Sequence, residues 1–169
     1  MVGARKCTPF GRNTAIQLSR SLSLSGVNIV SGMARGIDSF SHLGCLECGG
    51  RTYAVLGCGV DICYPADNQD LYHDIPEHGA LISEFVPGSA PTPSNFPKRN
   101  RIIAALSKGI VVVEARKGSG SLITAELGLN MGKDIFAIPG RPCDILSEGC
   151  NHLIKAGAKP VITPYDILE

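Results

Sequence analysis

Short apolar runs alternate along the chain with longer helical stretches. The apolar runs predict strands over residues 27–30, 52–56, 80–85, 110–113 and 135–138. The stretches after them predict helices over residues 38–48, 68–78, 96–106, 122–131 and 148–156. Strands of about five residues separated by helices of about ten are typical of a parallel sheet with both faces covered. The pattern therefore predicts an α/β fold with a mostly parallel sheet between two layers of helices.

The first expected strand is unusually short. It would have to lie within residues 1–5, where only Val2 is available before Gly3. Because a strand needs about five residues, either this strand is stunted or a preceding segment has been cut away, which puts the edge of the sheet in question. The chain stops at Glu169, directly after a short expected helix. We interpret residues 1–169 as one domain and as a fragment of a longer protein.

Charge is distributed unevenly on an almost neutral chain. The net charge is +1, yet residues 60–86 hold six acids and no Lys or Arg, whereas residues 95–117 hold six bases and one acid. Such a layout suits a local site for a polyanion on a neutral body.

The seven cysteines indicate a reducing compartment. Their number is odd, and the chain shows no secretory signal or membrane-spanning stretch, so we expect free thiols and a cytoplasmic protein without membrane contact. Cys45 and Cys48 form a C-x-x-C within an expected helix, but no second ligand pair follows at zinc spacing. We therefore expect buried thiols, no metal and no cofactor.

Several turns rich in glycine or arginine mark a candidate anion site. Lys98, Arg99 and Arg101 fall near an expected helix start, where cations oppose the helix dipole unless a bound anion resolves the conflict. The loop 118–121, Gly-Ser-Gly-Ser, offers free backbone N–H groups at another helix start. Loops 3–6, 31–36 and 116–121 all follow strands, so their bases can converge at one edge of the sheet. Together with the 96–101 turn they supply Arg5, Lys6, Arg35, Lys98, Arg99, Arg101, Arg116 and Lys117.

Each loop taken alone also has a structural interpretation of about equal weight. Arg35 can pair with Asp38, and Ser119 or Ser121 can cap a helix. Dinucleotide binding is disfavoured, because Ile123 and Ile62 stand where the third glycine of G-x-G-x-x-G belongs. The chain has neither a Walker A pattern nor a G-x-S-x-G elbow, its histidines lie in expected helices, and Glu126 suits a surface position. We therefore expect a binding protein rather than an enzyme.

Specific motifs complete the picture. The stretches VGARKCTPFGR, SGMARGID, GALISEFVPG, NFPKRNRIIA and GSGSLITAE follow one another along almost the whole chain. In these motifs the chain resembles the DNA-processing protein A family, also called DprA or Smf. The resemblance implies an extended Rossmann-like fold that binds and protects single-stranded DNA, loads the RecA recombinase during natural transformation and forms homodimers. It also implies a helical domain before and a winged-helix-like domain after this part, both absent from residues 1–169.

Motif matching and the glycine–serine loop together define the expected DNA-binding set. Within it we expect Arg99 to be the stronger DNA contact and Arg101 to be an internal brace, and Phe96 either to stack on a base or to staple its helix start. We expect a dimer through residues 134–158. Two alternatives remain open: a phosphoribohydrolase-like enzyme, which would need a PGGxGT loop and a nearby catalytic glutamate, and a sensor of a small nucleotide. The full set is Arg5, Lys6, Arg35, Phe96, Lys98, Arg99, Asn100, Arg101, Ser119, Gly120, Ser121 and Thr124.

Overall fold

The computed structural model describes residues 1–168 and contains two parallel three-stranded sheets. The first has the strand order β1-β2-β3 and the second the order β4-β5-β6. The strands are β1 (Ile29–Ser31), β2 (Thr52–Val55), β3 (Ala80–Ile82), β4 (Gly109–Val112), β5 (Asp134–Ala137) and β6 (Lys159–Pro160).

The N-terminal residues join the two sheets into one layer. The N–H of Val2 donates to the carbonyl of Val111 at 2.9 Å, and the N–H of Val113 donates to the carbonyl of Val2 at 3.1 Å. On the other side, the Met1 amine donates to the carbonyl of Val30 at 2.7 Å. Val2 itself forms only an isolated parallel bridge, with Val112. The expected first strand is therefore represented by the single bridge residue Val2, which lies in the centre of the layer and not at an edge.

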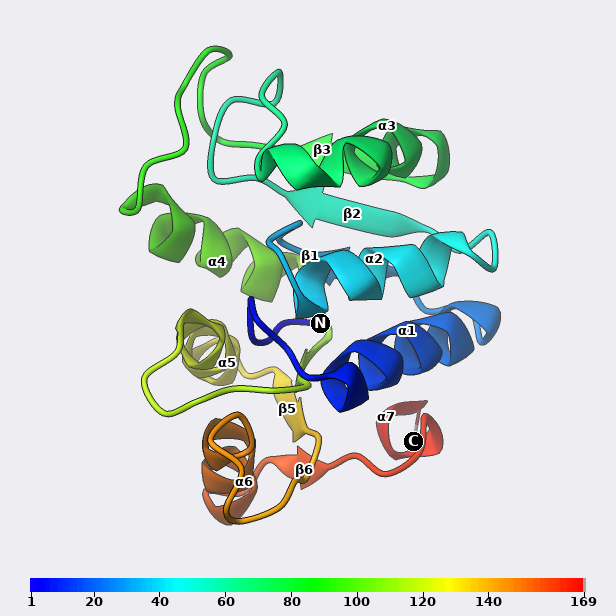
Figure 1. Cartoon of the computed structure of the whole chain (residues 1–169), viewed down its shortest axis with the longest axis vertical. Helices are drawn as coiled ribbons and strands as arrows, with labels where there is room; N and C mark the ends of the chain where they lie inside the picture. The colour runs from blue at the N-terminus through cyan, green and yellow to red at the C-terminus, as the bar shows by residue number, and fades with distance from the viewer. Residues whose placement is uncertain (169) are drawn as a thin grey trace.

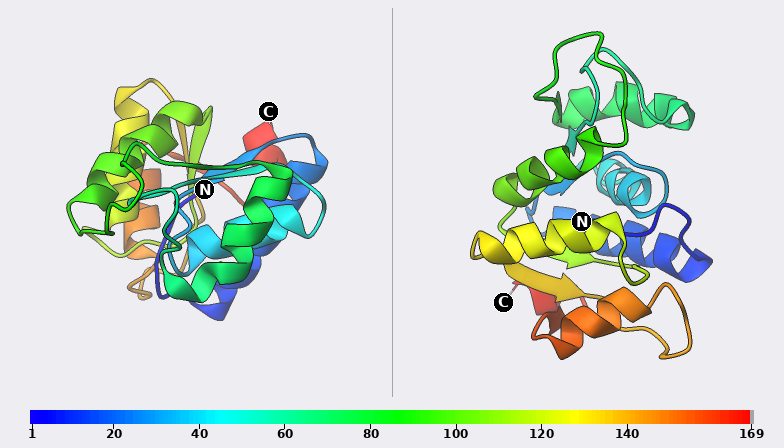
Figure 2. Two further views of the ribbon diagram at one scale, coloured as in Figure 1. Left: turned by 90° about the horizontal axis from the view of Figure 1, so that it is seen from above. Right: turned by 90° about the vertical axis from the view of Figure 1, so that its left-hand side faces the viewer.

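Helices cover both faces of this layer (Figure 2), which confirms the predicted three-layer Rossmann-like fold. One face carries α1 (Pro9–Leu24), α2 (Ile37–Leu46) and α3 (Gln69–His78), the last preceded by a 3-10 turn at Ala66–Asn68. The other face carries α4 (Asn95–Leu106), α5 (Gly120–Asn130) and α6 (Glu148–Lys155). The short helix α7 (Tyr165–Leu168) follows β6.

The core lies on both sides of the strands, as expected for a parallel sheet covered twice. On the α1 and α2 side, Ile37 packs in one buried cluster with Val111 and Val113. On the α4 and α5 side, Val112 belongs to a second buried cluster that includes Ile103. Successive residues of β4 thus point to opposite faces, and a continuous apolar run is what such a strand requires.

The apolar pattern misses helix α1 and the two-residue strand β6. The buried positions of α1 are Gly11, Ala15, Leu18, Ser19 and Leu22, so small and polar residues make up much of its inner stripe. Two smaller differences concern the residues at which elements end. Strand β3 ends at Ile82 rather than Phe85, and α2 ends at Leu46, which leaves Cys48 beyond the helix.

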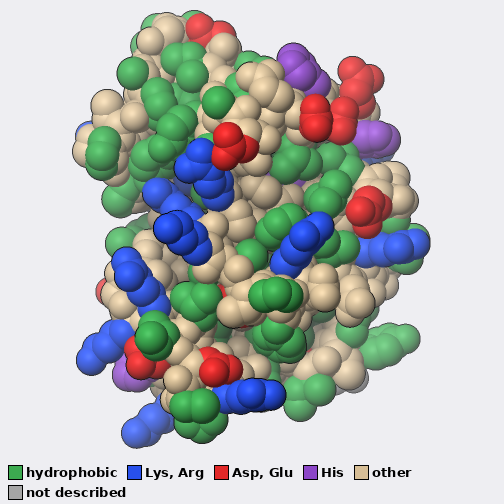
Figure 3. Space-filling model, viewed as in Figure 1, with side chains coloured by type: hydrophobic (Ala, Val, Ile, Leu, Met, Phe, Trp, Pro, Cys, Tyr) green, Lys and Arg blue, Asp and Glu red, His purple; other side chains and the backbone are tan. Residues whose placement is uncertain are grey.

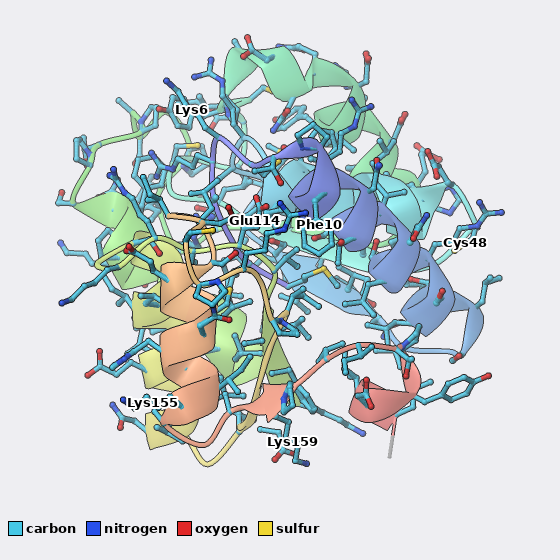
Figure 4. All side chains as sticks on the ribbon, turned by 60° about the horizontal axis from the view of Figure 1, so that its bottom comes forward. Lys6, Phe10, Cys48, Glu114, Lys155 and Lys159 are labelled. Atoms are coloured by element: carbon cyan, nitrogen blue, oxygen red, sulfur yellow. The ribbon has the colours of Figure 1, made fainter. Side chains whose placement is uncertain are left out.

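The first turn of α1 is capped by side chains of the protein, and Figure 4 shows Glu114 close to this turn, beside Phe10. Thr8 caps the helix by accepting from the N–H of Gly11 at 3.1 Å. The buried carboxylate of Glu114, from the end of β4, accepts from the N–H of Thr8 at 2.9 Å and from its hydroxyl at 2.5 Å. A carboxylate at a helix N-terminus is favourable, so this helix start has its anion already. Within residues 1–168, no helix combines the length and apolar character needed to cross a membrane.

Candidate functional site

A cleft of about 760 Å³ opens where the chain leaves the central strands. It lies where the strand order reverses between β1 and β4, the usual binding crevice of an open α/β sheet. Its walls come from the loop after Val2, the start of α4 and the start of α5. Figure 1 shows the N-terminal loop in blue between α4 and α5.

The structure brings most of the expected binding residues together in this cleft and leaves three outside it. Arg35, Lys98 and Arg101 are exposed but do not line it. Arg116, one of the eight bases of the candidate loops, does line it. The expected residues in the cleft are Arg5, Lys6, Phe96, Arg99, Asn100, Ser119, Gly120, Ser121 and Thr124.

Arg99 forms the floor of the cleft and is the internal brace that we expected Arg101 to be. Its side chain is only 4% exposed. Its guanidinium donates to the carbonyl of Gly32 at 2.8 Å and to the carbonyl of Val55, and so ties together the ends of β1 and β2. These two carbonyls and the nearby Asp38 carboxyl compensate this cation near a helix start. A side chain at Gly32 would displace this guanidinium, because a Cβ would lie 2.6 Å from one of its nitrogens.

The assignment of Arg101 as the brace is wrong. Its side chain is 55% exposed and pairs with Glu84 on the outside of the molecule. The two arginines differ because residues two apart lie about 200° apart around a helix. The pattern predicted that only one of them can face inward, but it did not show which one.

Arg35 is held by a partner other than the one expected. It pairs with Asp67 at 2.7 Å, and both side chains are more than 60% exposed. Asp38 is buried instead and accepts from the N–H of Gly32 at 3.2 Å. Burial raises the pKa of the Asp38 carboxyl, and the nearby charge of Arg99 partly offsets this shift.

The start of α5 differs from that of α1 because no side chain caps it. The hydroxyls of Ser119 and Ser121 bond to each other at 2.8 Å, and no side chain caps the first turn, in which Gly120 and Ser121 line the cleft. The amide of Asn100 donates to the carbonyl of Gly120 at 3.3 Å and fixes the loop against α4. An open helix N-terminus of this kind is an anion site.

The cleft also contains an aromatic cluster. The ring of Phe96 lies 5.6 Å from that of Tyr64, centroid to centroid. The guanidinium carbons of Arg5 and Arg99 lie 5.2 Å and 5.9 Å from the Phe96 centroid, within the range of cation–π contacts. Sequence reasoning missed Tyr64, because it belongs to a loop after β2 that only the tertiary fold brings to the cleft.

The charge pattern agrees with this placement. Figure 3 shows Lys and Arg side chains running down the left and centre of the face seen in Figure 1, while acidic side chains gather at the upper right. Among the described residues that line the cleft, Asp38 is the one carboxylate, and it is engaged by Gly32. The cleft is therefore a basic, partly aromatic site with open backbone donors.

Comparison with known proteins now assigns the family. A model of the DNA recombination-mediator protein A family matches residues 1–169. The chain belongs to this family. The resemblance seen in the sequence motifs is thereby confirmed. The chain is 45% identical to the DNA processing protein DprA of Streptococcus pneumoniae over 168 residues. That match covers 99% of this chain and 59% of the relative, so the chain spans little more than half of it.

Solved structures of family members have the same fold. The structure of DprA from Streptococcus pneumoniae superposes with a TM-score of 0.93 at 44% identity, covering 99% of this chain and 59% of that one. A structure of DNA processing protein A from Helicobacter pylori superposes with a TM-score of 0.90 at 30% identity. That structure gives insight into the single-stranded DNA binding mode of the Helicobacter pylori protein. It covers 99% of this chain and 76% of that one.

Proposed function

We propose that this domain binds single-stranded DNA in the cleft between α4 and α5. The observation that carries the proposal is the joint presence, in one cleft, of an uncapped helix start, exposed arginines and aromatic rings. The helix start and the arginines suit phosphates, and the aromatic rings suit bases. The single-stranded DNA binding mode of the Helicobacter pylori relative supports the same class of ligand.

The geometry suggests how a strand is held. A phosphate fits at the start of α5, where backbone N–H groups and the helix dipole favour an anion. Arg5 and Arg116 line the same cleft and are exposed, so they can reach neighbouring phosphates. Arg99 acts beneath them, because it is buried and its guanidinium already donates to the carbonyls of Gly32 and Val55 and to the side-chain oxygen of Asn100.

The first expected result is a preference for single strands. Oligo-dT is expected to bind at least about tenfold more tightly than a duplex of equal length, because only a single strand can splay its bases onto aromatic side chains. Fluorescence anisotropy with both labelled oligonucleotides at one salt concentration measures the ratio. Equal affinity for the two forms would contradict the proposal.

The second expected result concerns the salt dependence of binding. Arg116→Ala is expected to weaken oligo-dT binding alike for all sequences and to reduce the slope of log affinity against log salt by about 0.7. Arg51→Ala is the matched control, because Arg51 is exposed and precedes β2, at the strand end away from the cleft. An unchanged slope in a folded Arg116→Ala protein would remove Arg116 from the site.

Arg35, Lys98 and Arg101 remain proposed DNA contacts outside the cleft. They are exposed, and a strand that leaves the cleft past α4 could meet Lys98 and Arg101. The ion pairs of Arg35 with Asp67 and of Arg101 with Glu84 are exposed, so a phosphate could compete for either guanidinium. The same salt titration applied to each alanine variant assigns or excludes the contact.

Protection of DNA, RecA loading and homodimerisation are further parts of the proposal. The DprA names of the relatives from Streptococcus pneumoniae and Bacillus subtilis support a role in DNA processing. For the dimer, part of the expected region is unsuitable, because β5 lies between β4 and β6 and Cys150 is buried. The most exposed large apolar residues of the described C-terminal part are Ile145, Ile162 and Tyr165, and we propose that a dimer uses these.

The cleft supports a binding role over a hydrolytic one. A phosphoribohydrolase needs a carboxylate beside its phosphate loop, but Glu126 is exposed and is absent from the described lining of the cleft. The carboxylate that does line the cleft, that of Asp38, is buried under the loop after β1. We therefore propose a site that holds a nucleic acid without reacting with it.

A further inference from the structure

Tyr64 is the exposed aromatic ring of the cleft. It lies in the loop between β2 and α3, lines the cleft and is 40% exposed. Phe96 is more buried, and protein groups surround its ring. A Cβ on Gly57 would lie 2.7 Å from the Phe96 ring, and the guanidinium groups of Arg5 and Arg99 also contact this ring. The accessible aromatic surface is therefore that of Tyr64.

The two rings form one platform. Their centroids lie 5.6 Å apart with an angle of 30° between the planes, an arrangement typical of offset aromatic pairs. A base inserted between them would need a separation of roughly 7 Å, twice the contact distance of about 3.5 Å between carbon atoms. A base can therefore stack on the outer face of Tyr64 but not between the rings.

The surroundings of Tyr64 favour a base over a phosphate. Pro91, Pro93 and Pro97 line the same cleft and come from the loop before α4 and from its first turn. The anion-binding groups come from a different element, the loop that leads into α5. The cleft thus offers an apolar, aromatic surface and an anion-binding surface together, which are the two surfaces that a nucleotide unit requires.

We propose that Tyr64 stacks on a nucleobase of the bound single strand, with Phe96 as the support that holds its ring. This inference rests on the proposed function of the cleft. Every base has a π-face, so such a contact tolerates any sequence. The tyrosine hydroxyl plays no part in the stack, so a phenyl ring at this position serves equally well.

Tyr64→Trp provides a direct test because the chain has no tryptophan. Saturating oligo-dT is expected to quench the fluorescence of this single tryptophan, whereas an abasic oligonucleotide of the same length is expected to leave it unchanged. Leu24→Trp is the control, since Leu24 is 70% exposed at the end of α1 and does not line the cleft. An unquenched tryptophan at position 64 on a protein saturated with oligo-dT would overturn the inference.

Affinities of a second set of variants separate stacking from a structural role. Tyr64→Ala is expected to bind oligo-dT about 5- to 150-fold more weakly, with the salt slope and the affinity for the abasic strand unchanged. Tyr64→Phe is expected to bind within about twofold of the unaltered chain. If Tyr64→Ala does not fold, Tyr64→Trp and Tyr64→Phe carry the test.

The outcomes distinguish this inference from the proposed function. If the unaltered chain fails to bind oligo-dT, the proposed function is wrong, and the stacking role falls with it. If the unaltered chain binds oligo-dT and a folded Tyr64→Ala binds equally well, only the stacking role of Tyr64 is wrong.

Discussion

Replacing Arg99 with alanine is expected to lower the free energy of unfolding by about 3 kcal/mol. The substitution removes the donors to the carbonyls of Gly32 and Val55 and leaves both groups buried beside a cavity. The two hydrogen bonds to these carbonyls join the ends of β1 and β2, so the loss of the bonds also loosens the floor of the cleft. Urea unfolding followed by circular dichroism measures the change, provided that the slope against urea stays constant.

Arg101→Ala is the matched control for Arg99→Ala, since the two residues lie on the same helix and carry the same charge. The Arg101 side chain is 55% exposed, and exposed pairs contribute little. Its replacement is expected to change the free energy of unfolding by no more than about 0.5 kcal/mol. Equal stability of the two variants would show that Arg99 does not brace the strand ends. A loss of DNA affinity in Arg99→Ala is informative only at temperatures where the variant is folded.

Acid is expected to destabilise the domain through His42, by about 3 kcal/mol between pH 7 and pH 4. His42 is fully buried on α2, and its Nδ1 lies 2.6 Å from the hydroxyl of Thr52. That hydroxyl donates to the carbonyl of Ile29, so it accepts from His42. Burial, together with the nearby charges of the Met1 amine and Arg99, lowers the pKa of His42 from 6.5 to about 3.

The direction of the effect follows from proton binding in the two states. Between pH 6.5 and pH 3 the unfolded chain binds a proton at His42 that the folded chain does not bind. Stability is therefore fully present above the unfolded pKa and is lost as the pH falls through this window. Denaturant midpoints from pH 7 to pH 4 measure the loss. His42→Asn cannot titrate, so it should be less stable at pH 7 but show a flatter pH profile; an unchanged profile would assign the acid sensitivity to other groups.

Much of the architecture could be predicted from local pattern. The strand around Val111 and Val112 was identifiable because a parallel strand buried on both faces must be apolar throughout. The loop 118–121 was recognisable because glycine and serine at a helix start leave backbone donors open, and the structure indeed leaves α5 uncapped by any side chain. The apolar pattern did not predict helix α1, because Gly11, Ser19 and other small residues are among those that the helix buries.

The sequence by itself determined the fold class, the candidate loops and the family, since these depend on periodicity and motifs that are local in the chain. Only the tertiary structure decided which arginine is buried, because the partners of Arg99 are carbonyls far away in sequence, at Gly32 and Val55. It also decided that Val2 lies at the centre of the sheet and that Tyr64 reaches the cleft. A charge or a ring acquires its role from the groups packed against it, and long-range packing sets those neighbours.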